Sequence, residues 1–195
     1  MRRQMNNIIS VFHSMFRILL LKLLHGKKAD VRLLERISPN VVLEVNRGAI
    51  IKLCKQVRIH SGSKVKVRDG GILSIGSNVR INYNCMIFCR HEINIGEGCE
   101  FGPGVLVYDH DHDFRHPGGL AAREYKVAAV NIGENCWIGA NTVILKGTTL
   151  GNNCVVGAGT VLRGDYPAGS VIVQKRESNI VGNIESRKDI DGNEV

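Results

Sequence analysis

The chain has 195 residues, of which 44% are hydrophobic but only 5% aromatic, with 22 glycines and a formal net charge of +8. This length suffices for a buried core without staples, and six cysteines without paired spacings, beside no export signal, predict a reducing cytoplasm. The positive charge is concentrated in residues 1–36, where eight Lys and Arg face two acidic residues. The rest of the chain is therefore not strongly basic, and no nucleic-acid partner is expected.

The first segment, residues 1–36, predicts an amphipathic helix that stops near Gly26. Its longest uninterrupted apolar run, residues 18–21, is too short to span a bilayer. Two interpretations are equally open. In the first, residues 5–28 lie peripherally on the anionic inner face of the membrane. In the second, the helix packs on its own domain or on a sister subunit. The apolar stripe consists of Ile8, Ile9, Phe12, Met15, Phe16, Leu19, Leu20, Leu23 and Leu24.

From residue 75 onwards, aliphatic residues recur every six positions, with one slip of two residues before Ile95. A small or medium side chain usually follows each of these anchors after four residues, and His91 is the exception. This period predicts short strands that end in tight turns and stack their anchors into a narrow column. Residues 41–73 alternate less strictly and are expected to form the first coils. The anchors are Ile75, Ile81, Ile87, Ile95, Phe101, Val107, Ile132, Ile138, Ile144, Leu150, Val156 and Leu162.

Cysteines fill several of the small positions in this pattern. A cysteine in such a position is expected to be a buried packing residue. Cys54 and Cys89 fall outside these positions, with no neighbouring residue that would indicate a nucleophile or a zinc ligand. The cysteines in small positions are Cys85, Cys99, Cys136 and Cys154.

Residues 108–129 interrupt the period and are expected to leave the coil as a loop that begins with YDHDHDFRHPGG. A calcium loop would need Gly and Glu where this segment has Phe114 and Leu120, and its histidines are crowded into one loop, so no metal is predicted. A solvated charged loop is the plain alternative. Catalysis is the third interpretation, because imidazole is a base near neutral pH.

The repeat NIGENCWIGANTVILKGTTLGNNCVVGAGTVL resembles that of the hexapeptide-repeat acyltransferases, and the whole chain is most similar to sugar and polysaccharide O-acetyltransferases of the maltose, capsule and colanic-acid type. The resemblance implies an all-β fold, a left-handed parallel β-helix over residues 37–180 with the helical segment before it and a polar tail, residues 181–195, after it. It also implies a homotrimer with active sites between subunits, acetyl-CoA as co-substrate and no metal.

On this resemblance, the segment VLVYDHDH ends in the family's catalytic histidine, which falls on His112, with His110 as the alternate general base. Asp111 is a neighbouring carboxylate and a candidate acceptor contact. Asn82 and Asn84 match a pair of which the first faces the acceptor and the reaction centre, where an amide can steady an oxyanion. A turn-forming role is at least as plausible for Asn84.

The WIGA and GAG segments match the family's contacts for the pantetheine arm of acetyl-CoA, because small side chains leave backbone amides open. Trp137 in the first segment can equally be a packing residue, and the unusual chain ending leaves the contacts at the adenine end open. The candidate cofactor-binding residues are Trp137, Gly139, Ala140, Ala158, Arg163 and Lys175.

These observations predict an acetyl-CoA-dependent O-acetyltransferase acting on a small-molecule or lipid-linked sugar. N-acetylation of an amino sugar or of a xenobiotic is the nearest alternative, since the chemistry at the histidine is the same. A β-helical scaffold without cofactor binding is the alternative from another class, because the fold alone does not determine function.

Overall fold

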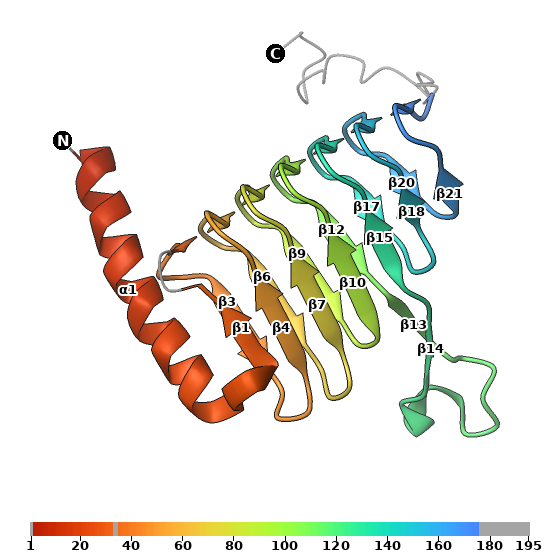
Figure 1. Ribbon diagram of the computed structural model, residues 1–195. Helices are drawn as coiled ribbons and strands as arrows, with labels where there is room; N and C mark the ends of the chain where they lie inside the picture. The colour runs from red at the N-terminus through yellow and green to blue at the C-terminus, as the bar shows by residue number, and fades with distance from the viewer. Residues whose placement is uncertain (1, 33–34, 176–195) are drawn as a thin grey trace, which may run out of the picture.

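The computed structural model describes residues 2–32 and 35–175, with side chains from residue 11 onwards. The helix α1 (Arg2–His25) and a short 3-10 helix, η1 (Gly26–Lys28), lead into a solenoid of parallel strands. Figure 1 shows α1 lying across the N-terminal end of the solenoid, whose coils follow one another along the chain. The expected tail, residues 181–195, lies outside the described residues.

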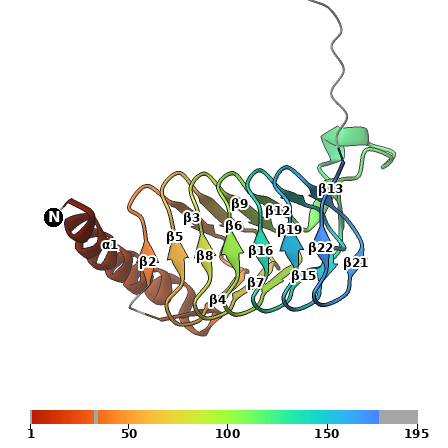
Figure 2. The same ribbon diagram turned by 90° about the horizontal axis from the view of Figure 1, so that it is seen from above.

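Three parallel sheets form the sides of the solenoid, and Figure 2 shows their strands repeating along its length. The first sheet contains β1 (Ala29–Val31), β4 (Ile50–Leu53), β7 (Ile72–Ile75), β10 (Glu92–Ile95), β15 (Val130–Ile132), β18 (Thr149–Leu150) and β21 (Asp165–Tyr166). The second contains β2 (Arg36–Ile37), β5 (Arg58–Ile59), β8 (Arg80–Ile81), β11 (Glu100–Phe101), β16 (Trp137–Ile138), β19 (Val155–Val156) and β22 (Val171–Ile172). The third contains β3 (Val42–Val45), β6 (Lys64–Val67), β9 (Met86–Cys89), β12 (Leu106–Tyr108), β17 (Val143–Ile144) and β20 (Val161–Leu162).

The core follows the six-residue period. Every anchor named above is at most 3% exposed, and each stacks on the anchor of the next coil, as Ile138 does between Phe101 and Val156. Burying such a column removes aliphatic surface from water in every coil, which is the main stabilising contribution to the fold. The four cysteines in small positions are buried, whereas His91, the exception to the pattern, is exposed. The predicted β-helix with an N-terminal helix is therefore confirmed.

The first coil begins earlier than the sequence suggested. The helix ends at His25, and Ala29 and Val31 of β1 already point into the core, 3% and 2% exposed. Strands β1 and β2 thus belong to the solenoid although they begin before residue 37, where the coils were expected to start. The period was hard to recognise here because η1 and two short strands replace regular six-residue units.

One face of α1 packs on this first coil. Ile18 is fully buried and Leu21 is 9% exposed, while the buried Ser14 hydroxyl donates to the carbonyl of Ile37 and accepts from its amide, both at 2.9 Å. Packing on its own domain, one of the two interpretations of the helix, is therefore observed for this face. Across the part of the chain that the structure describes, no helix has the length and hydropathy needed to cross a bilayer.

Candidate active site

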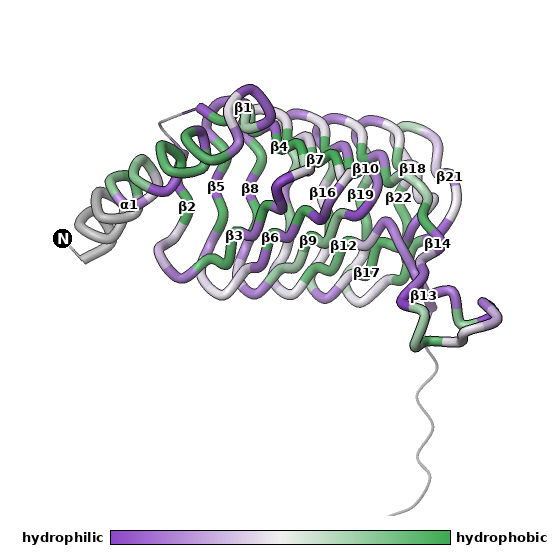
Figure 3. Tube along the Cα trace, turned by 90° about the horizontal axis from the view of Figure 1, so that it is seen from below, coloured by the Kyte–Doolittle hydropathy of each residue, from purple (hydrophilic) through white to green (hydrophobic). Residues whose placement is uncertain are grey.

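The chain leaves the solenoid between β12 and β15 and forms a small antiparallel hairpin. Strands β13 (His110–His112) and β14 (Tyr125–Val127) pair in a register that sets His110 opposite Val127 and His112 opposite Tyr125, with a 3-10 helix, η2 (Gly119–Ala122), near its tip. Figure 1 shows the hairpin projecting from one side of the solenoid, and Figure 3 shows its largely hydrophilic colouring. The hairpin thus carries two histidines out of the coil at a fixed register.

Asp109, the last residue before the hairpin, is fully buried and holds His110. Its carboxylate accepts hydrogen bonds from the backbone amides of Arg90, at 2.9 Å to each oxygen, and His91, at 2.7 Å. One carboxylate oxygen, Oδ1, also lies 2.8 Å from Nδ1 of His110. Because Nδ1 faces the carboxylate, Nε2 is left as the ring nitrogen that can exchange a proton with a substrate.

The charged form of Asp109 is favoured despite its burial. Burial raises the pKa of this carboxyl, but the hydrogen bonds from His110 and from the amides of His91 and Arg90 outweigh that effect and lower the pKa below its ordinary value. A carboxylate that accepts several hydrogen bonds keeps its charge at neutral pH. Asp109 therefore presents a fixed negative charge to the imidazole of His110.

Aromatic rings enclose His110, whose side chain is 8% exposed. The imidazole packs edge-on against Phe88 of β9 at a centroid distance of 4.8 Å and against Tyr125 of β14 at 5.6 Å. The guanidinium of Arg90 lies 3.5 Å from the centroid of Tyr125, which fixes that ring from the other side. The imidazole is thereby locked in orientation by residues from three separate segments.

His112 has a different environment, although it is only two residues away. It is exposed, and its ring lies 4.6 Å from Tyr125 at a tilted angle. The intervening Asp111 is also exposed, with a carboxylate oxygen 3.7 Å from Nζ of Lys146 in an ion pair that water screens. Of the two histidines, His110 has the buried carboxylate partner and His112 has the open position.

The two asparagines occupy a turn between the second and third sheets. Asn84 adopts a left-handed conformation with a φ of 57°, as does Asn141 two coils further on with a φ of 55°. Asparagine is one of the few residue types that tolerates this conformation, so the turn accounts for Asn84. Asn82 directly follows β8, and its side-chain oxygen accepts from the amide of Tyr83 at 2.9 Å. Its amide nitrogen remains a possible donor to a bound group.

Three of the six predicted cofactor residues line the same edge as Asn82, where the second sheet turns into the third. We call this line of Asn82, Gly139, Ala140 and Ala158 the small-residue edge. Successive coils approach closely here, since a Cβ added to Gly139 would lie 2.5 Å from the backbone nitrogen of Ala158. Glycine is therefore required by packing at this position, whether or not a ligand binds. Trp137, on the adjoining β16, is 59% exposed and so is not a core residue.

One of the remaining candidates lies on a different edge. Arg163 directly follows β20 and therefore lies where the third sheet turns into the first, on the edge from which the hairpin emerges. We call the line of Asp109, His110 and Arg163 the hairpin edge. Lys175 is exposed and follows β22, the last strand of the second sheet, so it lies on the side of the small-residue edge. Within one chain, the structure thus distributes the candidate residues over two different edges of the solenoid.

Asp109 was missing from the residues that the sequence singled out. The signal was present, because Val105, Val107 and Asp109 follow the inward alternation of a strand and all three are fully buried. A carboxylate on the inward side of a coil needs hydrogen-bond donors there. Among the described residues, no group of three His, Cys, Asp or Glu side chains is arranged to hold a metal ion.

Comparison with known families identifies the repeat. Residues 129–164 match the family described as bacterial transferase hexapeptide (six repeats). The resemblance inferred from the six-residue period is therefore confirmed, and the hexapeptide repeat accounts for β15 to β20 of the solenoid.

Relatives extend the similarity beyond this stretch. Nodulation protein L of Rhizobium leguminosarum bv. viciae is 47% identical over 100 residues, which is 50% of this chain and 51% of that protein. The chain thus spans about half the length of this relative. The crystal structure of a maltose O-acetyltransferase from Clostridium difficile 630 is similar at 29% identity over 60% of each chain, with a TM-score of 0.52.

A third relative shares the fold alone. AntD, an N-acyltransferase from Bacillus cereus solved in complex with dTDP and 3-hydroxybutyryl-CoA, covers 78% of this chain with 80% of its own, at 21% identity and a TM-score of 0.59. The hexapeptide solenoid is therefore common to proteins described as O-acetyl and as N-acyl transferases.

Proposed function

We propose that the protein is an acetyl-CoA-dependent sugar O-acetyltransferase in which His110 is the general base and Asp109 is its positioning residue. The observation that carries this proposal is the 2.8 Å contact between Nδ1 of His110 and the buried carboxylate of Asp109. A base held by a third group in this way is the recurring arrangement of acyl-transfer sites. The similarity to the maltose O-acetyltransferase supports the choice of acetyl transfer to a sugar hydroxyl.

In this mechanism, Nε2 of His110 takes the proton of an acceptor hydroxyl as its oxygen attacks the carbonyl carbon of the thioester. Acetyl-CoA supplies the acetyl group, its carbon–sulfur bond breaks, and the thiolate leaves as the thiol with the proton that Nε2 had taken from the acceptor hydroxyl. The imidazolium formed at His110 is stabilised by the charge of Asp109. The side-chain amide of Asn82 is a neutral donor suited to the developing oxyanion.

The proposal assigns the base to His110, which the sequence offered as the alternate to His112. The buried carboxylate partner and the aromatic enclosure of His110 support this choice, because catalysis requires a fixed geometry. His112, on the open face of the hairpin, is then a candidate contact for the acceptor, together with Asp111.

A homotrimer completes the proposed site. Asn82 and the backbone around Gly139, Ala140 and Ala158 lie on the small-residue edge, whereas His110 lies on the hairpin edge of the same chain. A cyclic assembly can place the hairpin of one protomer beside the small-residue edge of the next. Small side chains along that edge leave room for the pantetheine arm, Trp137 flanks it, and Arg163 and Lys175 are candidates for the phosphates of acetyl-CoA.

All six cysteines are free thiols, which supports a cytoplasmic location.

The decisive experiment compares His110→Ala with His112→Ala in an assay that measures thiol release from acetyl-CoA over a panel of sugar acceptors. We expect His110→Ala to lower turnover by about a hundredfold or more, the usual contribution of a general base, and His112→Ala to have a smaller effect. Circular dichroism and thermal melting verify that both variants are folded. Near-normal turnover of His110→Ala combined with a large loss in His112→Ala would transfer the role to His112.

The same assay addresses the alternatives. Amino sugars in the panel detect N-acetylation, and the preferred acceptor decides between the two activities. A scaffold without cofactor binding would show no rise in melting temperature with coenzyme A, because only a ligand of the native state stabilises it.

A further inference from the structure

The outer face of α1 is a continuous apolar surface that the solenoid does not cover. Because Ser14, Ile18 and Leu21 face the first coil, the residues on the opposite side of the helix point away from the protein. Six large apolar side chains on this side are between 47% and 82% exposed, although two of them, Leu20 and Leu24, also line a small pocket beside β3. We call them the outer face of α1: Phe12, Phe16, Leu19, Leu20, Leu23 and Leu24.

The position of α1 makes this face accessible to a flat surface. The helix lies across the end of the solenoid, so the coils all extend from its other side (Figure 1). Figure 3 shows hydrophobic residues running along the described part of the helix. A planar partner can therefore contact the outer face along the helix, and of the coils only the first ones, next to α1, lie near it.

The charge of the helix restricts the kind of partner. No Asp or Glu occurs between Arg2 and His25, whereas Arg17 and Lys22 are basic, and the exposed Lys27 and Lys28 follow in η1. Helices with an apolar face and basic polar positions bind anionic lipid surfaces. Two copies joined through their outer faces would instead bring two positively charged surfaces together.

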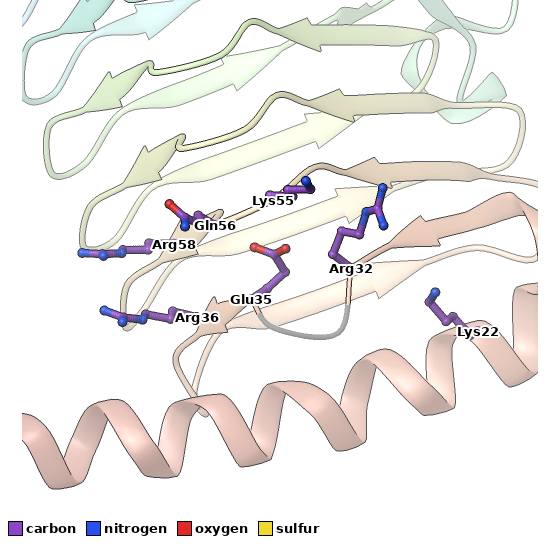
Figure 4. A pocket seen from close by; sticks show the side chains of 7 residues that line it. All are labelled: Lys22, Arg32, Glu35, Arg36, Lys55, Gln56 and Arg58. Carbon is purple, nitrogen blue, oxygen red and sulfur yellow. The ribbon is translucent and has the colours of Figure 1, made fainter.

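A basic pocket of about 660 Å³ lies beside α1, between the helix and the first two coils. Figure 4 shows Lys22 rising from the helix toward the coils, with Arg32 on one side of the pocket and Arg36 on the other. Five of its lining residues are basic and one is acidic. The pocket is lined by Lys22, Arg32, Glu35, Arg36, Lys55, Gln56 and Arg58.

Two of these arginines lie side by side on neighbouring strands. Arg36 of β2 and Arg58 of β5 are partners in the parallel register, and Figure 4 shows their side chains extending in the same direction. Two guanidinium groups on one side of the pocket attract an anion more strongly than one would.

The one acidic residue of the pocket does not offset this positive charge fully. Glu35 is completely buried, with Oε2 accepting from the amide of Val57 at 2.5 Å and Oε1 without a hydrogen-bond partner among the described residues. Burial raises the pKa of this carboxyl to about 7, so part of the population is neutral at physiological pH. The pocket therefore keeps a net positive charge and can receive an anion.

We propose that α1 docks the protein on an anionic phospholipid surface, with the outer face inserted at the interface and the basic pocket beside it binding lipid phosphate groups. The outer face supplies apolar area for insertion, and the pocket supplies charge complementarity to the headgroups. The inference goes beyond the proposed acetyl transfer and does not depend on it. In this proposal the two interpretations of the helix apply to different faces: one face packs on the first coil and the outer face contacts lipid.

The test is co-sedimentation of the full chain with vesicles of phosphatidylcholine alone and of phosphatidylcholine mixed with phosphatidylserine. We expect binding to the anionic vesicles only, weakened by added salt because salt screens the headgroup charge. Phe16→Gln with Leu23→Gln removes two exposed apolar side chains and should reduce binding by about tenfold or more. The matched control, Val171→Gln with Val173→Gln, removes two exposed apolar side chains at the far end of the solenoid and should leave binding unchanged.

A second pair of variants tests the pocket. Arg36→Gln with Arg58→Gln should reduce binding to anionic vesicles by about tenfold or more, since each basic residue near the surface contributes to attraction. Arg47→Gln with Lys64→Gln removes the same charge from exposed positions outside the pocket and should have little effect.

Three outcomes would overturn the proposal. Wild-type protein that ignores both kinds of vesicle, or binds both equally, contradicts an anionic lipid partner. A wild type that forms an oligomer in sedimentation velocity but binds no vesicles would be a second such outcome. If Phe16→Gln with Leu23→Gln removes that oligomer, the outer face is a contact between copies. The third is a wild type that binds inorganic phosphate in calorimetry but binds no vesicles. If Arg36→Gln with Arg58→Gln abolishes the phosphate binding, the pocket is a site for a free anion.

Discussion

The coils and the hairpin that leaves them position their side chains by different means. In the coils, an inward residue such as Ile138 contacts the equivalent residues of the coils before and after it, here Phe101 and Val156. At the base of the hairpin, His110 is held by Asp109, by Phe88 of β9 and by Tyr125 of β14. Repetition fixes the first kind of position, and the meeting of unrelated segments fixes the second.

This difference separates stability from chemistry. A coil position can be exchanged only for a residue of similar volume, because close-packed neighbours lie above and below it. A hairpin position depends on orientation and charge instead. The two regions should therefore respond to substitution in different assays, and the following predictions are arranged by the size of the expected effect.

In the coils, Ile138→Ala should destabilise the protein by about 2–5 kcal/mol, because Ile138 is fully buried and its removal leaves a cavity in the column. Urea unfolding measures this loss. Val161→Ala is the matched control, because Val161 is an aliphatic residue of another coil strand, β20, but is 44% exposed. It should change stability by less than about 1 kcal/mol. Equal losses at the two positions would contradict the stacked-column description.

At the base of the hairpin, Asp109→Asn should lower kcat by about ten- to a hundredfold, since it removes a charged hydrogen-bond partner of His110. KM for the acceptor should change little, because Asp109 is buried and positions the base without contacting the substrate. Asp113→Asn, which weakens a 3.1 Å ion pair with Lys126 elsewhere in the hairpin, is the control. A rise in KM with unchanged kcat would show that Asp109 does not act through His110.

At the N-terminal end, Glu35→Gln should alter how stability depends on pH. The folded state keeps the Glu35 proton up to a pKa of about 7, whereas the unfolded chain loses it near 4.5, so wild-type stability should fall as pH rises through this window and level off above it. Glutamine removes this titration. The melting temperature of Glu35→Gln relative to wild type should therefore be higher at pH 8 than at pH 5, and a difference independent of pH would contradict the assignment.

Much of the fold could be predicted, but the site only in part. The buried anchors and the four buried cysteines in small positions follow from the period, and the helix from its three- and four-residue spacing. The choice between His110 and His112 could not be made, because alternation along a strand gives both the same direction. Asp109 was not among the candidate site residues because its hydrogen-bond donors, the amides of Arg90 and His91, lie 19 and 18 residues away.

A local repeat is enough to specify the solenoid, since each coil contacts little besides its neighbours. The identity of the histidine with a buried carboxylate partner, and of the face of α1 that remains open, depends on contacts that exist only in the folded chain. Those features arise where the hairpin meets β9 and where the helix meets β2. Contacts between distant segments leave no period in the chain, so the sequence pattern alone does not reveal them.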